Sequence, residues 1–315
     1  MLAERIERAA FGGHETFPVR YTWLPKAVRF VSDDPFFFQR EDAMVRLGVG
    51  KNMVRSIRHW SLACAVVEED SAHARGQALR VTELGQKVFG EDGWDPYLED
   101  PATIWLMHWQ AAKSPRRSTT WYWVFSHLPQ PEFSRLDLVA WLRKLAHENG
   151  WTRASEGTIR RDVDCLIRSY ANPAPNKKTA IEESLDSPLA ELGLIREFGS
   201  RSHFLLMRGE QATLPDELFV CALTEYLRSR TTEAKTLPLN AVAFGSGSPG
   251  RVFCLDEEAV VARLERLGRR TEDALVFDET AGLRQVLVRE VPEGIRILAH
   301  HYERPVSRVA VRGRP

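Results

Sequence analysis

A short stretch near the N-terminus carries side chains that suit phosphodiester chemistry. In AFGGHETFPVRYTWLPK (residues 10–26), two glycines precede His14 and Glu15, and Arg20 follows five positions after the glutamate. A histidine can act as a general base, a glutamate can bind a metal ion or orient the histidine, and an arginine can clamp a phosphate. We therefore predict His14, Glu15 and Arg20 as catalytic residues.

The same stretch also has a purely structural interpretation. It precedes the first predicted module as an arm, and Phe17 and Trp23 are apolar enough to dock it. In this alternative His14 and Glu15 hydrogen-bond the arm onto that module, because buried polar groups need partners. In either case we expect the arm to fold back against the first module, with its polar residues lining a DNA groove.

A predicted helix that begins at residue 51 (KNMVRSIRHWSLACAVV) separates apolar from basic side chains. At about 100° per residue, the two sides hold Met53, Ile57, Trp60 and Cys64 against Lys51, Arg55 and Arg58. Asn52 lies at the start of the helix, where recognition helices touch base edges. We predict that Lys51, Asn52, Arg55 and Arg58 bind DNA. The alternative is a solvated basic face on an ordinary helix.

The elements around this helix have the order of a helix-turn-helix with a wing. Residues 36–90 predict a short helix, a glycine-containing turn, the basic helix, a strand and a closing helix. Residues 101–150 are helical and rich in aromatic side chains, which favours a buried scaffold that joins two modules.

A second helix followed by a hairpin comes after the scaffold. SEGTIRRDVDCLIRSYA (residues 155–171) predicts the helix, and LGLIREFGSRSHFLLMR (residues 192–208) predicts the hairpin. We expect one face of this helix to be buried and the other to be exposed. The apolar face holds Ile159, Val163, Leu166 and Tyr170, and the opposite face holds Arg161, Asp164 and Arg168. Arg201 lies at the tip of the hairpin. We predict Arg161, Arg168 and Arg201 as DNA contacts, with a solvated surface as an equal alternative because the interposed acid weakens the attraction for phosphate.

The third segment begins at Pro215 and mixes helices with strands. It predicts a helix, a glycine-rich loop that enters a strand (GSGSPGRVFCL, residues 245–255), a second helix and a strand pair. The predicted fold is therefore mainly α (α+β), with winged-helix or helix-turn-helix modules joined by a helical scaffold and small β-hairpins. The predicted domains are 1–95 for the arm and first module, 96–210 for the scaffold and second module, and 211–315 for the third segment with its basic tail.

Composition limits the class of protein. The chain has 315 residues with 43 basic and 43 acidic side chains, so DNA binding must come from local basic faces. We expect no secretory signal and no membrane span, because no apolar run approaches about 18 residues. The four cysteines are scattered, which argues against structural zinc and indicates a cytoplasmic protein.

Two further motifs are weak. Asp216 and Glu233 imitate the Pro-Asp and Glu-x-Lys signature of a large nuclease class, but Asp216 opens a predicted helix instead of lying on a strand. FGSGSPG lacks the lysine of a phosphate-binding loop. Phosphodiester cleavage needs a carboxylate metal site or a nucleophile with a base. A divalent metal, Mg or Mn, is thus the candidate cofactor, and no organic cofactor is expected.

Four motifs together carry a resemblance to a known family: GGHETFPVRYTWLPK, LGVGKNMVRSIRHW, SPLAELGLI and GSPGRVFCLDE. The chain resembles the domain-of-unknown-function proteins of bacterial DNA phosphorothioation and phage-defence islands, whose best-described members are the SspB-type DNA nicking subunits. The resemblance implies a DNA nickase that gives the modification machinery access to one strand. It also implies partner proteins: a cysteine desulfurase, an ATPase and a sulfur-activating ATP pyrophosphatase.

The sequence thus predicts a cytoplasmic nicking endonuclease that binds double-stranded DNA and supports single-strand phosphorothioate modification. The first alternative is a non-enzymatic DNA-binding adaptor or transcriptional regulator that recruits the modification enzymes. A second alternative is a protein-interaction scaffold, which the neutral net charge and the 9 tryptophans favour.

Overall fold

The computed structural model describes residues 9–73, 77–152, 154–171, 187–199, 202–230, 235–280 and 282–304. Helices dominate these residues, and their strands form one two-stranded and two three-stranded antiparallel sheets. The predicted α+β class is confirmed. None of the described helices is long and apolar enough to cross a membrane.

The first segment contains the predicted helix, turn and basic helix. Its elements are α1 (Trp23–Asp33), η1 (Phe37–Gln39), α2 (Ala43–Leu47), α3 (Lys51–Ala63), β1 (Val67–Glu69), β2 (Leu79–Val81) and α4 (Glu83–Phe89). Gly48 ends α2 in the left-handed conformation (φ 70°), which a glycine adopts without strain. The apolar side of α3 is buried at Ile57 and Trp60, as its periodicity predicts. The amphipathic helix α1 was not anticipated from the sequence.

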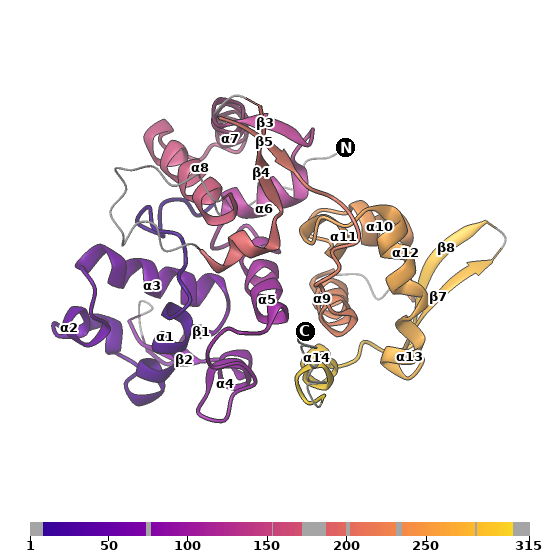
Figure 1. Cartoon of the computed structure of the whole chain (residues 1–315), viewed down its shortest axis with the longest axis horizontal. Coiled ribbons are helices and arrows are strands. Elements are labelled where there is room, and N and C mark those ends of the chain that lie inside the picture. The colour runs from indigo at the N-terminus through magenta and orange to yellow at the C-terminus, as the bar shows by residue number, and fades with distance from the viewer. Residues whose placement is uncertain are drawn as a thin grey trace, which may run out of the picture.

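Two helices form the scaffold at the centre of the molecule (Figure 1). In α5 (Pro101–Ala112) every residue from Ala102 to Ala112 is buried, and α6 (Thr119–His127) is buried almost throughout. A helix that is apolar all round belongs in a core, because no face can meet water favourably. Helix α5 contacts α3, α6, η4 (Pro188–Leu192) and α9 (Asp216–Ser229), so it joins all three segments. The predicted buried aromatic scaffold is confirmed for α5 and α6, whereas the last part of the predicted segment, residues 135–148, forms a helix with only one buried side.

The second segment places two helices against a small sheet. Its other elements are β3 (Glu132–Ser134), α7 (Arg135–Glu148), α8 (Glu156–Tyr170), β4 (Ile195–Glu197) and β5 (His203–Leu206), with sheet order β3-β5-β4. Ser134 and Asp137 form a reciprocal capping box that starts α7, and Ser155 caps α8. Ile159, Val163 and Leu166 of α8 are fully buried, as predicted.

The third segment repeats this order. After α9 come β6 (Thr236–Pro238), α10 (Leu239–Phe244), α11 (Pro249–Val252), α12 (Glu257–Glu265), α13 (Leu267–Thr271), β7 (Leu275–Thr280), β8 (Leu283–Val288) and α14 (Gly294–Tyr302). The sheet order is β6-β8-β7, so in both segments the last strand lies between the other two. The prediction of a strand after the glycine-rich loop is wrong. Ser248 instead caps the short helix α11 with proline at its first position, a common start of a helix.

Candidate nucleic-acid interface

The arm (residues 9–22) passes between α3 and α8 and makes a tight turn at the predicted catalytic residues. The N–H of Phe17 donates to the carbonyl of His14 (2.8 Å), and Glu15 and Thr16 between them have left-handed φ angles of 48° and 70°. A residue other than glycine in the left-handed region of backbone conformation costs about 1–3 kcal/mol. The turn therefore persists only because the residues around it hold it in place.

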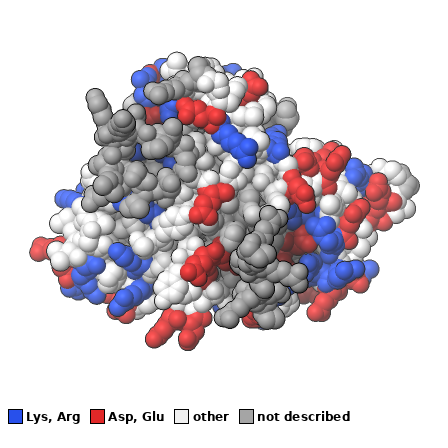
Figure 2. Space-filling view, viewed as in Figure 1, with Lys and Arg blue, Asp and Glu red and all other residues white. Residues whose placement is uncertain are grey.

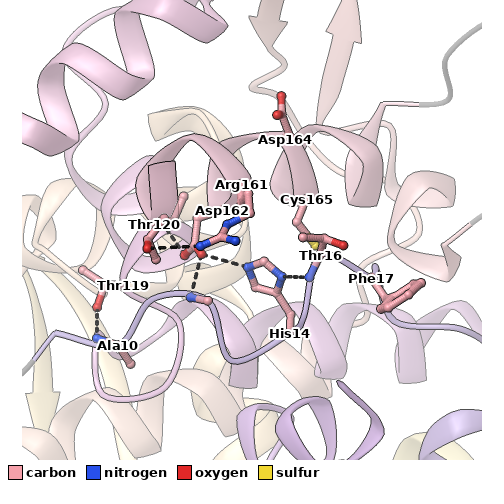
Figure 3. Close-up of polar contacts among 12 residues, drawn as sticks. Ala10, His14, Thr16, Phe17, Thr119, Thr120, Arg161, Asp162, Asp164 and Cys165 are labelled. Atoms are coloured by element: carbon pink, nitrogen blue, oxygen red, sulfur yellow. Dashed lines mark hydrogen bonds and ion pairs between the residues drawn. The ribbon is translucent and has the colours of Figure 1, made fainter. Parts of the chain in front are cut away.

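A buried carboxylate holds one side of this turn (Figure 3). Asp162 of α8 accepts hydrogen bonds from the Gly12 N–H (2.7 Å), from His14 Nε2 (2.9 Å) and from the Thr120 hydroxyl (3.1 Å). His14 and Asp162 are 2% and 1% exposed. Since the carboxylate only accepts, the His14 nitrogen that faces it carries a proton.

The neighbours of His14 act on its charge state in opposite directions. Burial lowers the pKa of His14, but the hydrogen bonds and charge interactions with Asp162 and Cys165 together outweigh burial and raise the pKa to about 10. The backbone N–H of Thr16 points at Nδ1 from 3.1 Å and opposes a second proton there. Both ring nitrogens are thus engaged by protein groups in the interior. A general base must reach the proton that it abstracts, so this geometry favours the structural interpretation of His14, and the catalytic role stays a prediction.

The other side of the turn is held by the first segment and by α8. The carbonyl of Phe17 accepts from Trp60 Nε1 (2.9 Å) and from the Ser56 hydroxyl (3.4 Å) of α3. The guanidinium of Arg168 donates to the carbonyl of Thr16. The arm therefore bridges two segments, whereas the sequence predicted docking on the first one only.

The arm contacts a basic residue on each of the two helices. Arg55 of α3 lies 3.5 Å from the Glu15 carboxylate, and Arg168 of α8 contacts the neighbouring Thr16. Lys51, Arg55, Arg161 and Arg168 are all exposed; we call these four residues the basic strip. Elsewhere basic and acidic side chains are interspersed, as Figure 2 shows for one face.

The remaining predicted residues lie in different settings. Asn52 is exposed in the first turn of α3. Arg58 is half-buried and lies 3.7 Å from Glu69, and its burial lowers its pKa. The guanidinium of Arg20 lies over the Trp23 ring, 5.6 Å from its centroid, which is a cation–π geometry. Arg201 lies outside the described residues.

The N-terminal part of the arm lines a large cavity of about 1270 Å³. Its wall combines residues 9–11 and 13 with parts of α3, of the loop 113–117, of residues 150–154 and of α9. His59 of α3 lines it, and no described group hydrogen-bonds its buried Nε2. Burial lowers the pKa of His59 to about 3, so the ring is neutral at physiological pH.

Sequence reasoning missed both Asp162 and His59. A signal for the first was available, because position 162 follows Ile159 by three residues and precedes Leu166 by four, which places it on the buried side of the helix. His59 directly precedes the buried Trp60, but its nearness to the arm depends on tertiary structure alone.

The nuclease-like motif of the third segment serves another purpose. Asp216 binds three arginines, Arg263 (2.9 Å), Arg266 (2.7 Å) and Arg270 (3.6 Å), and is largely buried. Glu233 lies outside the described residues. Within the described part of the chain no three His, Cys, Asp or Glu side chains form a group that could bind a metal ion. Magnesium often uses only one or two carboxylates with waters and substrate phosphates, but no described residue is marked out as its ligand.

Comparisons with known proteins cover almost the whole chain. Residues 11–302 match the family described as "Protein of unknown function (DUF4007)". The structure described as "Magnesium ion-bound SspB crystal structure" is 30% identical, covers 96% of this chain and 92% of its own, and superposes with a TM-score of 0.84. The "SspB crystal structure" is 31% identical, covers 96% and 93%, and has the same TM-score. No curated protein matches the chain.

Proposed function

This chain belongs to the DUF4007 family and is of the SspB type, and from this membership and the geometry of the arm we propose that it binds and nicks DNA. The nick supports single-strand phosphorothioate modification in a phage-defence system. The partner proteins are those that the family resemblance implies: an ATPase, a sulfur-activating enzyme and a cysteine desulfurase.

The observation that carries the DNA-binding part is the basic strip. Helix α3 exposes Lys51 and Arg55, and α8 exposes Arg161 and Arg168. The arm between the two helices contacts Arg55 through Glu15 and Arg168 through Thr16. Phosphate contacts of this kind supply affinity without sequence preference. A protein with zero net charge needs such a local concentration of basic residues in order to attract DNA.

The topology supports winged-helix modules. In the second segment α8 follows α7 and precedes the hairpin β4–β5, and α3 similarly follows α2 and precedes the hairpin β1–β2. In helix-turn-helix proteins the helix at this position enters the major groove. We therefore assign α3 and α8 as the two DNA-facing helices, with Asn52 of α3 placed to read a base edge.

Salt-dependent binding tests this assignment. For every basic side chain that no longer binds a phosphate, the slope of log affinity against log salt should fall by about 0.9. The double variant Lys51→Ala/Arg55→Ala should therefore bind duplex DNA more weakly, with a slope smaller by about two. The control Arg269→Ala/Arg296→Ala removes the same charge from exposed positions on α13 and α14 and should leave the slope unchanged. Equal slopes for both double variants would remove α3 from the interface.

Nicking is tested with supercoiled plasmid and Mg²⁺ or Mn²⁺, with and without a chelator. Open-circular product that requires the metal supports the nickase. Under this proposal Glu15, with a side chain 34% exposed, is the catalytic carboxylate candidate. Glu15→Gln should then lower nicking while the melting temperature stays within about 2 °C, because surface ion pairs contribute little stability.

The non-enzymatic adaptor is the second candidate, and the burial of His14 favours it. A protein that shifts duplex DNA in a gel but leaves plasmid supercoiled with either metal is an adaptor. The absence of both properties would leave the protein-interaction scaffold.

A further inference from the structure

None of the four residues of the basic strip lines the large cavity beside the arm. Its volume of about 1270 Å³ exceeds the roughly 300–1,000 Å³ of pockets for drug-sized ligands. All three segments contribute to its wall, so it exists only in the assembled fold. It therefore has room for a nucleotide together with part of its backbone.

Aromatic and basic side chains are combined in the wall. Phe11 of the arm and Trp151 after α7 are half-buried, with ring centroids 6.0 Å apart. Arg116 is exposed, and within the described residues its guanidinium has no hydrogen-bond or ion-pair partner. Arg117 beside it forms an ion pair with Glu69 (3.2 Å). Aromatic faces for stacking beside cations for phosphates are the combination that binds single-stranded nucleic acid.

A buried polar group also lines this cavity. His59 Nε2 makes no hydrogen bond with the described residues, although buried polar atoms are almost always paired. Gly13 leaves room for the ring, since a Cβ there would lie 2.4 Å from His59 Nδ1.

We propose that this cavity binds an unpaired nucleotide of a DNA strand, with the base against Phe11 and Trp151 and the phosphate at Arg116. The proposal deepens the proposed function, on which it rests: the basic strip holds the duplex, and the cavity beside the arm takes the separated strand. An enzyme that acts on one strand has a use for such a site, because extruded nucleotides are recognised by stacking and by contacts to the base edge.

Binding of three fluorescent oligonucleotides tests the proposal: a single strand, a perfect duplex and a duplex with one bulged nucleotide. Trp151→Ala should lower affinity for the single strand and the bulged duplex about tenfold, the effect expected when one base no longer stacks on an aromatic ring. Affinity for the perfect duplex should be unchanged. The control Trp94→Ala removes a half-buried tryptophan that stacks on Tyr302 and should alter none of the three.

Arg116→Ala keeps the test decisive if Trp151→Ala fails to fold, because Arg116 is exposed and supports no packing. It should weaken binding of the single strand and the bulged duplex and spare the perfect duplex. Unchanged single-strand binding in both variants, or an equal decrease in affinity for all three oligonucleotides, would overturn the proposal. Failure of the basic strip looks different, since Lys51→Ala/Arg55→Ala would then leave duplex affinity intact. A mononucleotide competitor shows how much of the strand the cavity requires. Displacement of the oligonucleotide shows that one nucleotide unit suffices, and no displacement shows that the flanking strand is required.

Discussion

Removal of the Asp162 carboxylate should loosen the arm and destabilise the whole protein. Asp162→Ala leaves the donors of Gly12, His14 and Thr120 without their acceptor in a site that is 1% exposed. Breaking a buried pair of this kind costs about 3–5 kcal/mol. At about 2 °C per kcal/mol for a chain of this size, the melting temperature should fall by roughly 6–10 °C.

Two matched variants separate the carboxylate's hydrogen bonds from its charge and from its helix. Asp162→Asn keeps an acceptor oxygen and should cost only about 1–2 kcal/mol, the difference between charged and neutral hydrogen bonds. Asp164→Ala, on the same helix, breaks only a surface pair with Arg135 (3.3 Å) and should cost under about 1 kcal/mol.

Urea unfolding and thermal melting of the three variants give the measurement. From the most to the least stable, the expected order is Asp164→Ala, Asp162→Asn and Asp162→Ala. Because Asp162 also holds the turn that presents Glu15 and Thr16, the alanine variant should bind duplex DNA more weakly. An Asp162→Ala protein that melts within about 2 °C of the parent would refute the claim that this carboxylate holds the arm.

Three further predictions concern single positions. Asn52→Ala should relax site preference by about 1–3 kcal/mol in competition binding between DNA sequences, with no decrease in melting temperature because Asn52 is exposed and Gly50, not Asn52, is the N-cap of α3. Gly13→Ala forces a shift of His59 and should destabilise by about 1–3 kcal/mol in urea. Burial raises the pKa of Asp216, but its arginine partners lower the pKa by more than burial raises it. The pKa of Asp216 therefore lies below its ordinary value. A carboxyl group whose pKa is depressed in the folded state stabilises the fold at pH values above its pKa in the unfolded state. Asp216→Asn should therefore have a lower free energy of unfolding than the parent at neutral pH, and this difference should shrink as the pH falls below about 4.

The sequence by itself determined the helices that carry the basic strip. The 3.6-residue period of a helix is a local property, so the spacing of Ile57 and Trp60, or of Ile159 and Val163, indicates which face is buried. The opposite basic faces at Lys51 and Arg161 follow from the same geometry. The start of α11 is also encoded locally, in a serine followed by proline, although the glycines before it favoured the prediction of a loop and a strand.

Only the tertiary structure decided what His14 contacts. Its partner Asp162 lies 148 positions away, and periodicity shows that a position is buried without showing which buried groups meet. The nearness of Gly13 to His59 and the joining of three segments around the cavity have the same origin. These contacts depend on how α3, α5 and α8 pack, and packing is a property of the complementary surfaces of whole elements. A histidine that looks poised for catalysis in the sequence is therefore, in the folded chain, 2% exposed and bound to a carboxylate, because a polar side chain taken into the core requires a partner there.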